Sequence, residues 1–160
     1  MAKEFCFPLT EVKENGELTI RAQTGSESFP DALTEGVLIG PVTLEGLIIA
    51  VDQEASMNGV ATGRWRFECT RCLTPVEEQW SSPLNVMAPI DAGPLDLTDE
   101  VRQAIALAQP MKIFCRPDCR GLCPVCRGNR NVKECGHKQA MEDPAPRPTR
   151  PRLTPRPNKG

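Results

Sequence analysis

Tyrosine is absent from this sequence, and aromatic residues make up only 4% of it. The chain also carries a single histidine, His137. Few aromatic side chains limit the apolar surface that a core can bury. The only histidine is a candidate metal ligand, so the sequence offers no Ser/His/Asp catalytic triad. It also contains no glycine-rich loop of the kind that binds phosphate groups. The sequence therefore predicts a modest core in a chain of 160 residues, a length typical of one domain.

Long apolar runs are missing as well. The richest run, residues 37–51 (VLIGPVTLEGLIIAV), is interrupted by Gly40, Pro41, Glu45 and Gly46. It is too short for a membrane span, which needs roughly 20 apolar residues. The N-terminal sequence MAKEFCFPLTEVKENGE contains no apolar segment of the kind found in secretory signals. We therefore expect a cytoplasmic protein with no membrane contact, whose cysteines are reduced.

Strand patterns dominate the first half of the chain. Residues 64–69 (RWRFEC) alternate strictly, which predicts a strand with Trp65, Phe67 and Cys69 on its buried face. Strands are also expected over 17–23, 42–51 and 76–88, and Pro83 favours an edge position for the last of these. The Asn58-Gly59 pair predicts a turn between two antiparallel strands.

One helix is predicted over residues 97–109. Asp96 or Thr98 can cap its first turn, and Pro110 ends it. The apolar residues recur at helical spacing and predict packing on the sheet: Leu97, Val101, Ile105 and Ala108. The predicted fold class is α+β, with residues 1–110 forming a small antiparallel β-meander and one packed helix.

Eight cysteines stand out against this background. Three close ligand pairs lie in residues 115–137, and an upstream Cys-x2-Cys pair makes four. Zinc takes four such ligands tetrahedrally, and Cys-x2–4-Cys pairs are its usual building units. Residues 111–140 are therefore predicted to form a zinc-ribbon-like module, joined by the upstream pair and holding two structural zinc ions. The predicted ligands are Cys69, Cys72, Cys115, Cys119, Cys123, Cys126, Cys135 and His137.

The spacing does not decide which pairs share an ion. The preferred arrangement joins Cys69 and Cys72 to Cys123 and Cys126, as a ribbon of two knuckles, and leaves 115, 119, 135 and 137 for the second ion. The alternative places the pairs 123/126 and 135/137 on one ion. An iron–sulfur cluster and a redox dithiol at Cys69 and Cys72 are further alternatives. Cys6 is expected to be an ordinary buried thiol.

The charge is divided unevenly along the chain. Residues 1–109 carry 7 Lys and Arg against 17 Asp and Glu, whereas residues 110–160 carry 12 against 4. A basic end on an acidic body predicts a polyanionic partner such as RNA, contacted through its backbone. The candidate RNA contacts are Lys112, Arg116, Arg120, Arg127, Arg130, Lys133 and Lys138.

The C-terminal segment, residues 141–160, is predicted to be a disordered tail. From residue 144 onward, 6 of 17 residues are Pro and 5 are Lys or Arg, with no acidic residue. Such a segment buries too little apolar surface to offset the entropy lost on ordering. A protein-binding adaptor that acts through this Pro-rich tail is therefore an alternative function.

Three sequences, in this order, resemble the YceD family of large ribosomal RNA subunit accumulation proteins: FECTRCLTPVEEQW, DLTDEVRQAIALAQPM and CRPDCRGLCPVCRGNRN. The similarity extends roughly over residues 42–137. Arg127 departs from it, because the family usually has Gly there, and the Pro-Arg repeats of the tail depart as well.

The resemblance implies a non-enzymatic ribosome biogenesis factor that supports accumulation of 23S-type rRNA. Its implied partners are ribosomal RNA or a pre-large-subunit particle, and a large-subunit ribosomal protein. It implies no small-molecule substrate.

Overall fold

The computed structural model describes residues 4–137 of the chain. The predicted disordered tail, Lys138 and the last residues of the predicted metal module lie outside the described residues. The division into body, module and tail therefore stays a prediction. No helix within residues 4–137 combines the length and the apolar character needed to cross a bilayer.

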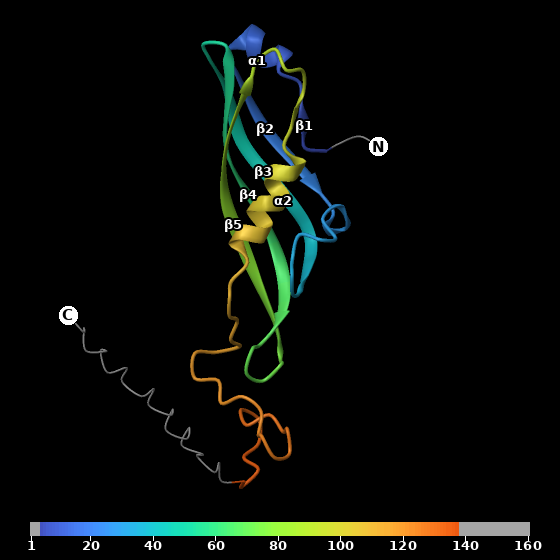
Figure 1. Ribbon diagram of the computed structural model, residues 1–160, viewed down its shortest axis with the longest axis vertical. Coiled ribbons are helices and arrows are strands. Elements are labelled where there is room, and N and C mark those ends of the chain that lie inside the picture. Colours follow the sequence, from blue (N-terminus) through green and yellow to red (C-terminus); the bar gives the residue numbers. More distant parts are fainter. Residues whose placement is uncertain (1–3, 138–160) are drawn as a thin grey trace, which may run out of the picture.

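Four long strands form the main sheet in the order in which they follow one another in the chain (Figure 1). They are β2 (Glu17–Thr24), β3 (Val37–Val51), β4 (Glu54–Glu68) and β5 (Pro75–Pro89), all antiparallel to their neighbours. A second, two-stranded sheet pairs β1 (Cys6–Phe7) with β6 (Leu95–Asp96). The predicted antiparallel meander is confirmed, and β5 with its Pro83 is an edge strand of the main sheet.

The predicted turn at Asn58-Gly59 is wrong, because β4 runs straight through both residues. The chain instead turns at Asp52 and Gln53, where Asp52 adopts a positive φ of 54°. Gly59 lies opposite Gly46 on β3, and a Cβ added at Gly59 would lie 2.6 Å from the carbonyl oxygen of Glu45. The glycine therefore permits a close approach of two strands rather than a reversal of the chain.

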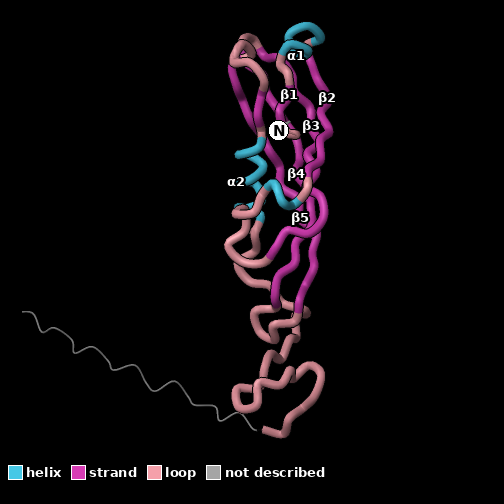
Figure 2. Tube along the Cα trace, turned by 90° about the vertical axis from the view of Figure 1, so that its right-hand side faces the viewer, coloured by secondary structure: helices cyan, strands magenta, loops and turns pink. Residues whose placement is uncertain are grey.

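Helix α2 (Thr98–Ala108) lies across one face of the sheet, as Figures 1 and 2 show. Asp96 precedes the helix, and its carboxylate accepts hydrogen bonds from the backbone N–H and the hydroxyl of Thr98. Gln109 leaves the helical conformation at ψ 123°, as expected for the residue before a proline. The short helix α1 (Thr10–Asn15) and the 3-10 turn η1 (Ser26–Ser28) were not predicted, because neither segment has a helical apolar stripe.

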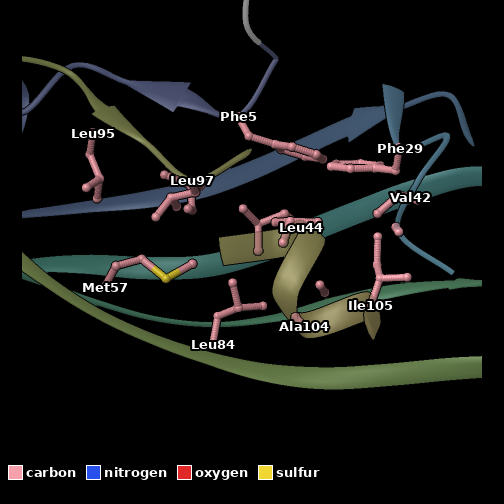
Figure 3. Close-up of a cluster of buried hydrophobic side chains, with 14 of the residues drawn as sticks. Phe5, Phe29, Val42, Leu44, Met57, Leu84, Leu95, Leu97, Ala104 and Ile105 are labelled. Atoms are coloured by element: carbon pink, nitrogen blue, oxygen red, sulfur yellow. The ribbon is translucent and has the colours of Figure 1, made fainter. Parts of the chain in front are cut away.

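The core lies between α2 and the inner face of the sheet. Leu44, Met57 and Leu84 from three strands belong to the same buried cluster as Ala104 and Ile105 of α2, and Phe5 stacks on Phe29 (Figure 3). The predicted alternation in β4 is confirmed, since Trp65, Phe67 and Cys69 are buried while Arg64, Arg66 and Glu68 are exposed. Trp65 stacks on Trp80 with ring centroids 5.8 Å apart.

After α2 the chain runs beyond the end of the β4–β5 hairpin (Figure 1). Residues 109–137 contain no helix or strand within the described part, apart from an isolated bridge between Leu122 and Asn129. Figure 2 shows this segment as loops that continue past the hairpin. Few apolar side chains hold these loops: Ile113 is buried against the main core. Something other than apolar packing must therefore fix their shape.

Candidate metal centres

The eight predicted ligands gather into two groups of four. Within each group the ligand atoms all lie within 4.8 Å of one another. The four-cysteine group consists of Cys69, Cys72, Cys115 and Cys119. The mixed group consists of Cys123, Cys126, Cys135 and His137. Cys6, which was expected to be buried, is half-buried in β1 and belongs to neither group.

The four-cysteine group joins the β4–β5 loop to the segment after α2. Cys69 Sγ lies 3.7 Å from Cys119 Sγ, and Cys72 Sγ lies 3.5 Å from Cys115 Sγ. Cys69, Cys72 and Cys119 are buried, and Cys115 is exposed. Thr70 aligns the two segments, since its backbone N–H and its hydroxyl both donate to the carbonyl oxygen of Ile113, at 2.8 and 2.9 Å.

The mixed group is formed within a single stretch of 15 residues, 123–137. Cys123 is buried and its Sγ lies 3.8 Å from His137 Nδ1. Cys126 and His137 are exposed, and Cys135 is half-buried. This group is therefore more open to solvent than the four-cysteine group.

The spacing of the ligand atoms fits a tetrahedral zinc ion. Sulfurs bound to zinc at about 2.3 Å in a tetrahedron lie about 3.8 Å from one another. The two observed sulfur–sulfur separations of 3.7 and 3.5 Å are close to this value. They are far longer than a disulfide bond of about 2.05 Å. A closed set of four ligands suits a structural ion, because it leaves no position for a substrate or a reactive water.

The preferred pairing of the two Cys-x2-Cys turns on one ion is wrong. Cys69 and Cys72 lie with Cys115 and Cys119, which is the alternative arrangement. The physical reason is the path of the chain after α2. The carbonyl oxygen of Ile113 accepts hydrogen bonds from Thr70 in the β4–β5 loop. Residues 115–119, which follow directly, therefore lie at this loop, whereas residues 123–126 come later in the chain.

The two Cys-x2-Cys turns have the same backbone structure although they belong to different groups. Cys69 N–H donates to Thr74 O, and Leu73 N–H donates to Cys69 O, at 2.8 and 2.9 Å. In the second turn Cys123 N–H donates to Gly128 O and Arg127 N–H to Cys123 O, both at 2.8 Å. The residue after the second cysteine has a positive φ in both turns, 59° at Leu73 and 56° at Arg127.

Backbone N–H groups in these turns point at the first cysteine of each pair. Burial raises the pKa of Cys69, but hydrogen bonds from the N–H groups of Cys115, Cys72 and Arg71 lower it, to about 6 overall. Hydrogen bonds from the N–H groups of Cys126 and Val125 likewise lower the pKa of Cys123 to about 6. Both shifts favour the thiolate, the form that binds metal.

Other sulfurs of the groups hold their protons more tightly. Desolvation and the neighbouring sulfurs of Cys72 and Cys119 raise the pKa of Cys115 to about 12. The pKa of Cys135 is raised as well: a hydrogen bond from the backbone N–H of His137 lowers it, but the nearby Cys123 sulfur and burial outweigh that effect. Each group therefore combines a sulfur that is ready to bind an ion with one that releases a proton on binding.

Three polar side chains around the groups were missed by the sequence reasoning. Asn131 Nδ2 lies 3.3 Å from Cys119 Sγ, Asn129 Nδ2 donates to the hydroxyl of Thr74 at 3.3 Å, and Thr74 Oγ1 lies 3.2 Å from Cys72 Sγ. The available signal was the pattern Asn-x-Asn directly after a Cys-x2-Cys turn. Asparagine is common in loops, so the pattern alone does not identify such contacts.

The predicted RNA contacts differ in their surroundings. Arg120 pairs with Glu134 at 2.6 Å, and Arg116 lies 3.8 Å from Asp118. Arg130 is half-buried and its N–H donates to Gly121 O. The others are exposed and form no ion pair within residues 4–137: Lys112, Arg127 and Lys133. Lys138 lies outside the described residues.

The redox alternative finds little support in the geometry of Cys69 and Cys72. Both are buried, and each has a sulfur of the 115–119 segment as its neighbour at 3.5–3.7 Å. Catalytic redox cysteines need an accessible thiolate. The Cys-x2-Cys turn also leads into β5 and not into a helix whose N-terminus would activate a thiol.

Comparison with protein-family models gives a match to the large ribosomal RNA subunit accumulation protein YceD, over residues 82–147. The YceD resemblance is confirmed over this segment. The matched segment includes α2 and the six ligands that follow it. It begins after the Cys69–Cys72 turn, so it starts later in the chain than the resemblance over residues 42–137 that the sequence predicted.

Mycobacterial proteins are similar over a larger part of the chain. A protein of Mycobacterium leprae is 31% identical over 121 residues, which is 65% of this chain and 55% of the relative. A protein of Mycobacterium tuberculosis is 28% identical over 130 residues, 71% of this chain and 61% of the relative. Both bear the name uncharacterized protein. No solved structure matches the chain significantly.

Proposed function

We propose that the protein is a non-enzymatic ribosome biogenesis factor that supports accumulation of 23S-type rRNA and assembly of the large subunit. Two structural zinc ions shape the loops after α2, and exposed basic residues of these loops contact rRNA or a ribosomal protein. The observation that carries the proposal is the YceD match, because it covers the same residues that contribute six of the eight metal ligands.

Zinc supplies the stability that the loops lack. Residues 109–137 have little apolar packing, and an ion held by four ligands contributes folding free energy directly. With Zn²⁺, four thiolates leave a formal charge of −2, and three thiolates with a neutral imidazole leave −1. Residues 69–72 and 110–137, which contain all eight ligands, carry seven Lys and Arg and two Asp and Glu, so the loaded segments keep a net charge of about +2.

This small net charge means that individual exposed cations carry the RNA contact, together with shape. The candidates within the described residues are Lys112, Arg127 and Lys133, which lack ion-pair partners there. Base stacking contributes little, because Trp65, Trp80 and Phe67 are buried in the core. Phe114 is 36% exposed but lies under the guanidinium of Arg71 at 4.6 Å. Contacts to the RNA backbone are therefore expected to dominate.

Sedimentation of the protein with ribosomal particles tests the proposal. We expect the full chain to move with pre-large-subunit particles at low salt and to be released at high salt. The double variant Arg127→Glu and Lys133→Glu should be released at lower salt. Arg21→Glu, which reverses one charge at an exposed position of β2 and removes the ion pair with Glu45, is the control for each single reversal. Failure to move with any ribosomal particle at any salt concentration would refute the proposal.

Depletion in the cell gives the functional readout. The ratio of mature 23S-type to 16S-type rRNA should fall when the protein is depleted, and it should recover with the wild-type chain. Deletion of residues 143–160 should only weaken recovery, whereas it should abolish recovery if the protein is an adaptor acting through its tail. A reactive disulfide between Cys69 and Cys72 in metal-free native protein would instead support the redox function.

A further inference from the structure

The segment between the two ligand pairs of the mixed group contains Asn129 and Asn131. A metal ion bound by Cys126 on one side and Cys135 on the other would close this segment, residues 127–134, into a loop. The two asparagine side chains do not face the mixed group, however. Their contacts lead to sulfurs of the four-cysteine group.

Asn131 contacts the four-cysteine group directly. Its Nδ2 lies 3.3 Å from Cys119 Sγ and donates its second hydrogen to Asn129 Oδ1 at 2.9 Å. Its Oδ1 accepts the backbone N–H of Arg120 at 2.8 Å, which fixes the orientation of the amide. A thiolate bound to metal accepts hydrogen bonds but donates none, so this N–H stabilises the metal-binding form of Cys119.

Asn129 contacts the four-cysteine group indirectly, through the hydroxyl of Thr74. Its Nδ2 donates to Thr74 Oγ1 at 3.3 Å, and the same oxygen accepts a hydrogen bond from the Cys72 thiol at 3.2 Å. When Cys72 is a thiolate, the Thr74 hydroxyl becomes the donor, and the amide of Asn129 holds that hydroxyl in place. Two of the four sulfurs are thus connected by hydrogen bonds to the loop of the mixed group, Cys119 directly and Cys72 through Thr74.

The backbone holds the loop in this position. Leu122 N–H donates to Arg71 O at 3.1 Å, and Arg130 N–H donates to Gly121 O at 3.0 Å. A Cβ at Gly121 would lie 3.0 Å from Arg71 O, so the glycine permits the close approach. Displacement of the loop would break these bonds as well as those of the asparagines.

We propose that the two groups bind metal cooperatively and that Asn129 and Asn131 are the positioning residues that couple them. The inference rests on the metal centres of the proposed function. An ion in the mixed group orders residues 127–134 and so completes the hydrogen bonds to Cys119 and to the Thr74 hydroxyl beside Cys72. Hydrogen-bond partners of metal ligands typically change metal affinity by about 10–100-fold. Coupling is reciprocal, so an ion in the four-cysteine group raises the affinity of the mixed group by the same factor.

Titration of the full metal-free chain with Co²⁺ tests the coupling. The visible bands of tetrahedral Co²⁺ differ between four thiolates and three thiolates with an imidazole, so each group has its own signature. In the wild type both signatures should rise together. In Asn131→Ala the four-cysteine signature should require about 10–100-fold more Co²⁺ and the two signatures should separate. The control Val132→Ala changes an exposed side chain of the same loop and should behave as the wild type.

Ligand variants separate coupling from a general loss of structure. His137→Ala disables the mixed group and should weaken the four-cysteine signature at least as much as Asn131→Ala, because it releases Asn129 as well as Asn131. The two changes combined should weaken it no further than His137→Ala alone, because the hydrogen bonds of Asn131 are already lost in that variant. Asn131→Asp keeps the acceptor for Arg120 but faces Cys119 with a carboxylate oxygen, so it should weaken the signature at least as much as Asn131→Ala.

The possible results distinguish this inference from the proposed function. Two signatures that rise independently in the wild type, or an unchanged four-cysteine affinity in both Asn131→Ala and His137→Ala, would refute the coupling and leave the metal centres intact. Absence of any thiolate–Co²⁺ band would refute both. Circular dichroism of the β-sheet should be the same in all variants, since the sheet folds around its own core.

Discussion

Arg127 offers the sharpest test of the local structure around the mixed group. It follows Cys126 in a turn that requires a positive φ, 56° here. A residue with a Cβ loses roughly 1–2 kcal/mol in this conformation. Glycine avoids that cost but loses about 0.5–1 kcal/mol of backbone entropy on ordering. Arg127→Gly should therefore stabilise the turn by about 0.5–1 kcal/mol, which corresponds to about 2–5-fold tighter metal binding by the mixed group.

The assay is competition for Zn²⁺ against a chelator, with Co²⁺ spectra to assign the group. Arg127→Ala is the matched control, because it removes the guanidinium and keeps the Cβ, and it should give no gain. Leu73→Gly should produce a parallel gain in the four-cysteine group, since Leu73 has a φ of 59° and is 55% exposed. Equal affinities of the glycine and alanine variants at position 127, or weaker binding by the glycine variant, would refute the reasoning.

Three further predictions concern pH, the sheet and the charge. Zn²⁺ affinity should fall with acidification throughout the neutral range, because Cys115 and Cys135, whose pKa values are raised, release protons on binding. It should fall more steeply below about pH 6, where the thiolates of Cys69 and Cys123 also take up protons, and a slope that becomes shallower there would contradict this. Gly59→Val should lower the free energy of unfolding by about 1–3 kcal/mol in urea melts, because its Cβ would lie 2.6 Å from Glu45 O, whereas Asn58→Ala should change it by less than about 0.5 kcal/mol. Lys133→Glu should reduce the slope of the logarithm of the RNA-binding constant against the logarithm of the salt concentration by about one, and an unchanged slope would exclude Lys133 from the contact.

Local sequence patterns predicted the elements of the fold well. The alternation of residues 64–69 depends only on neighbours along the chain, and so does the end of α2 before Pro110. The helix predicted over 97–109 is observed at Thr98–Ala108. The hairpin turn was placed wrongly because Asn58-Gly59 is a common turn pair, and only the facing Gly46 on β3 explains why a glycine is needed within the strand.

The candidate site likewise contains residues that the sequence predicted and residues that it did not. The short spacing of the cysteine pairs identified all residues that gather into the two groups, because two ligands a few residues apart converge on one point at small entropic cost. The roles of Asn129 and Asn131 were not predictable, since their partners Thr74 and Cys119 are 55 and 12 residues away in the chain.

The sequence by itself determined that the chain carries a β-meander, a helix and four pairs of metal-type ligands, because strand alternation, helix ends and short ligand spacings are local properties. The tertiary structure alone decided which pairs meet. Cys69 lies beside Cys119, 50 positions later in the chain, because α2 packs on the sheet and delivers residues 113–119 to the end of the β4–β5 hairpin. That proximity depends on the packing of the whole body, which no short stretch of sequence encodes.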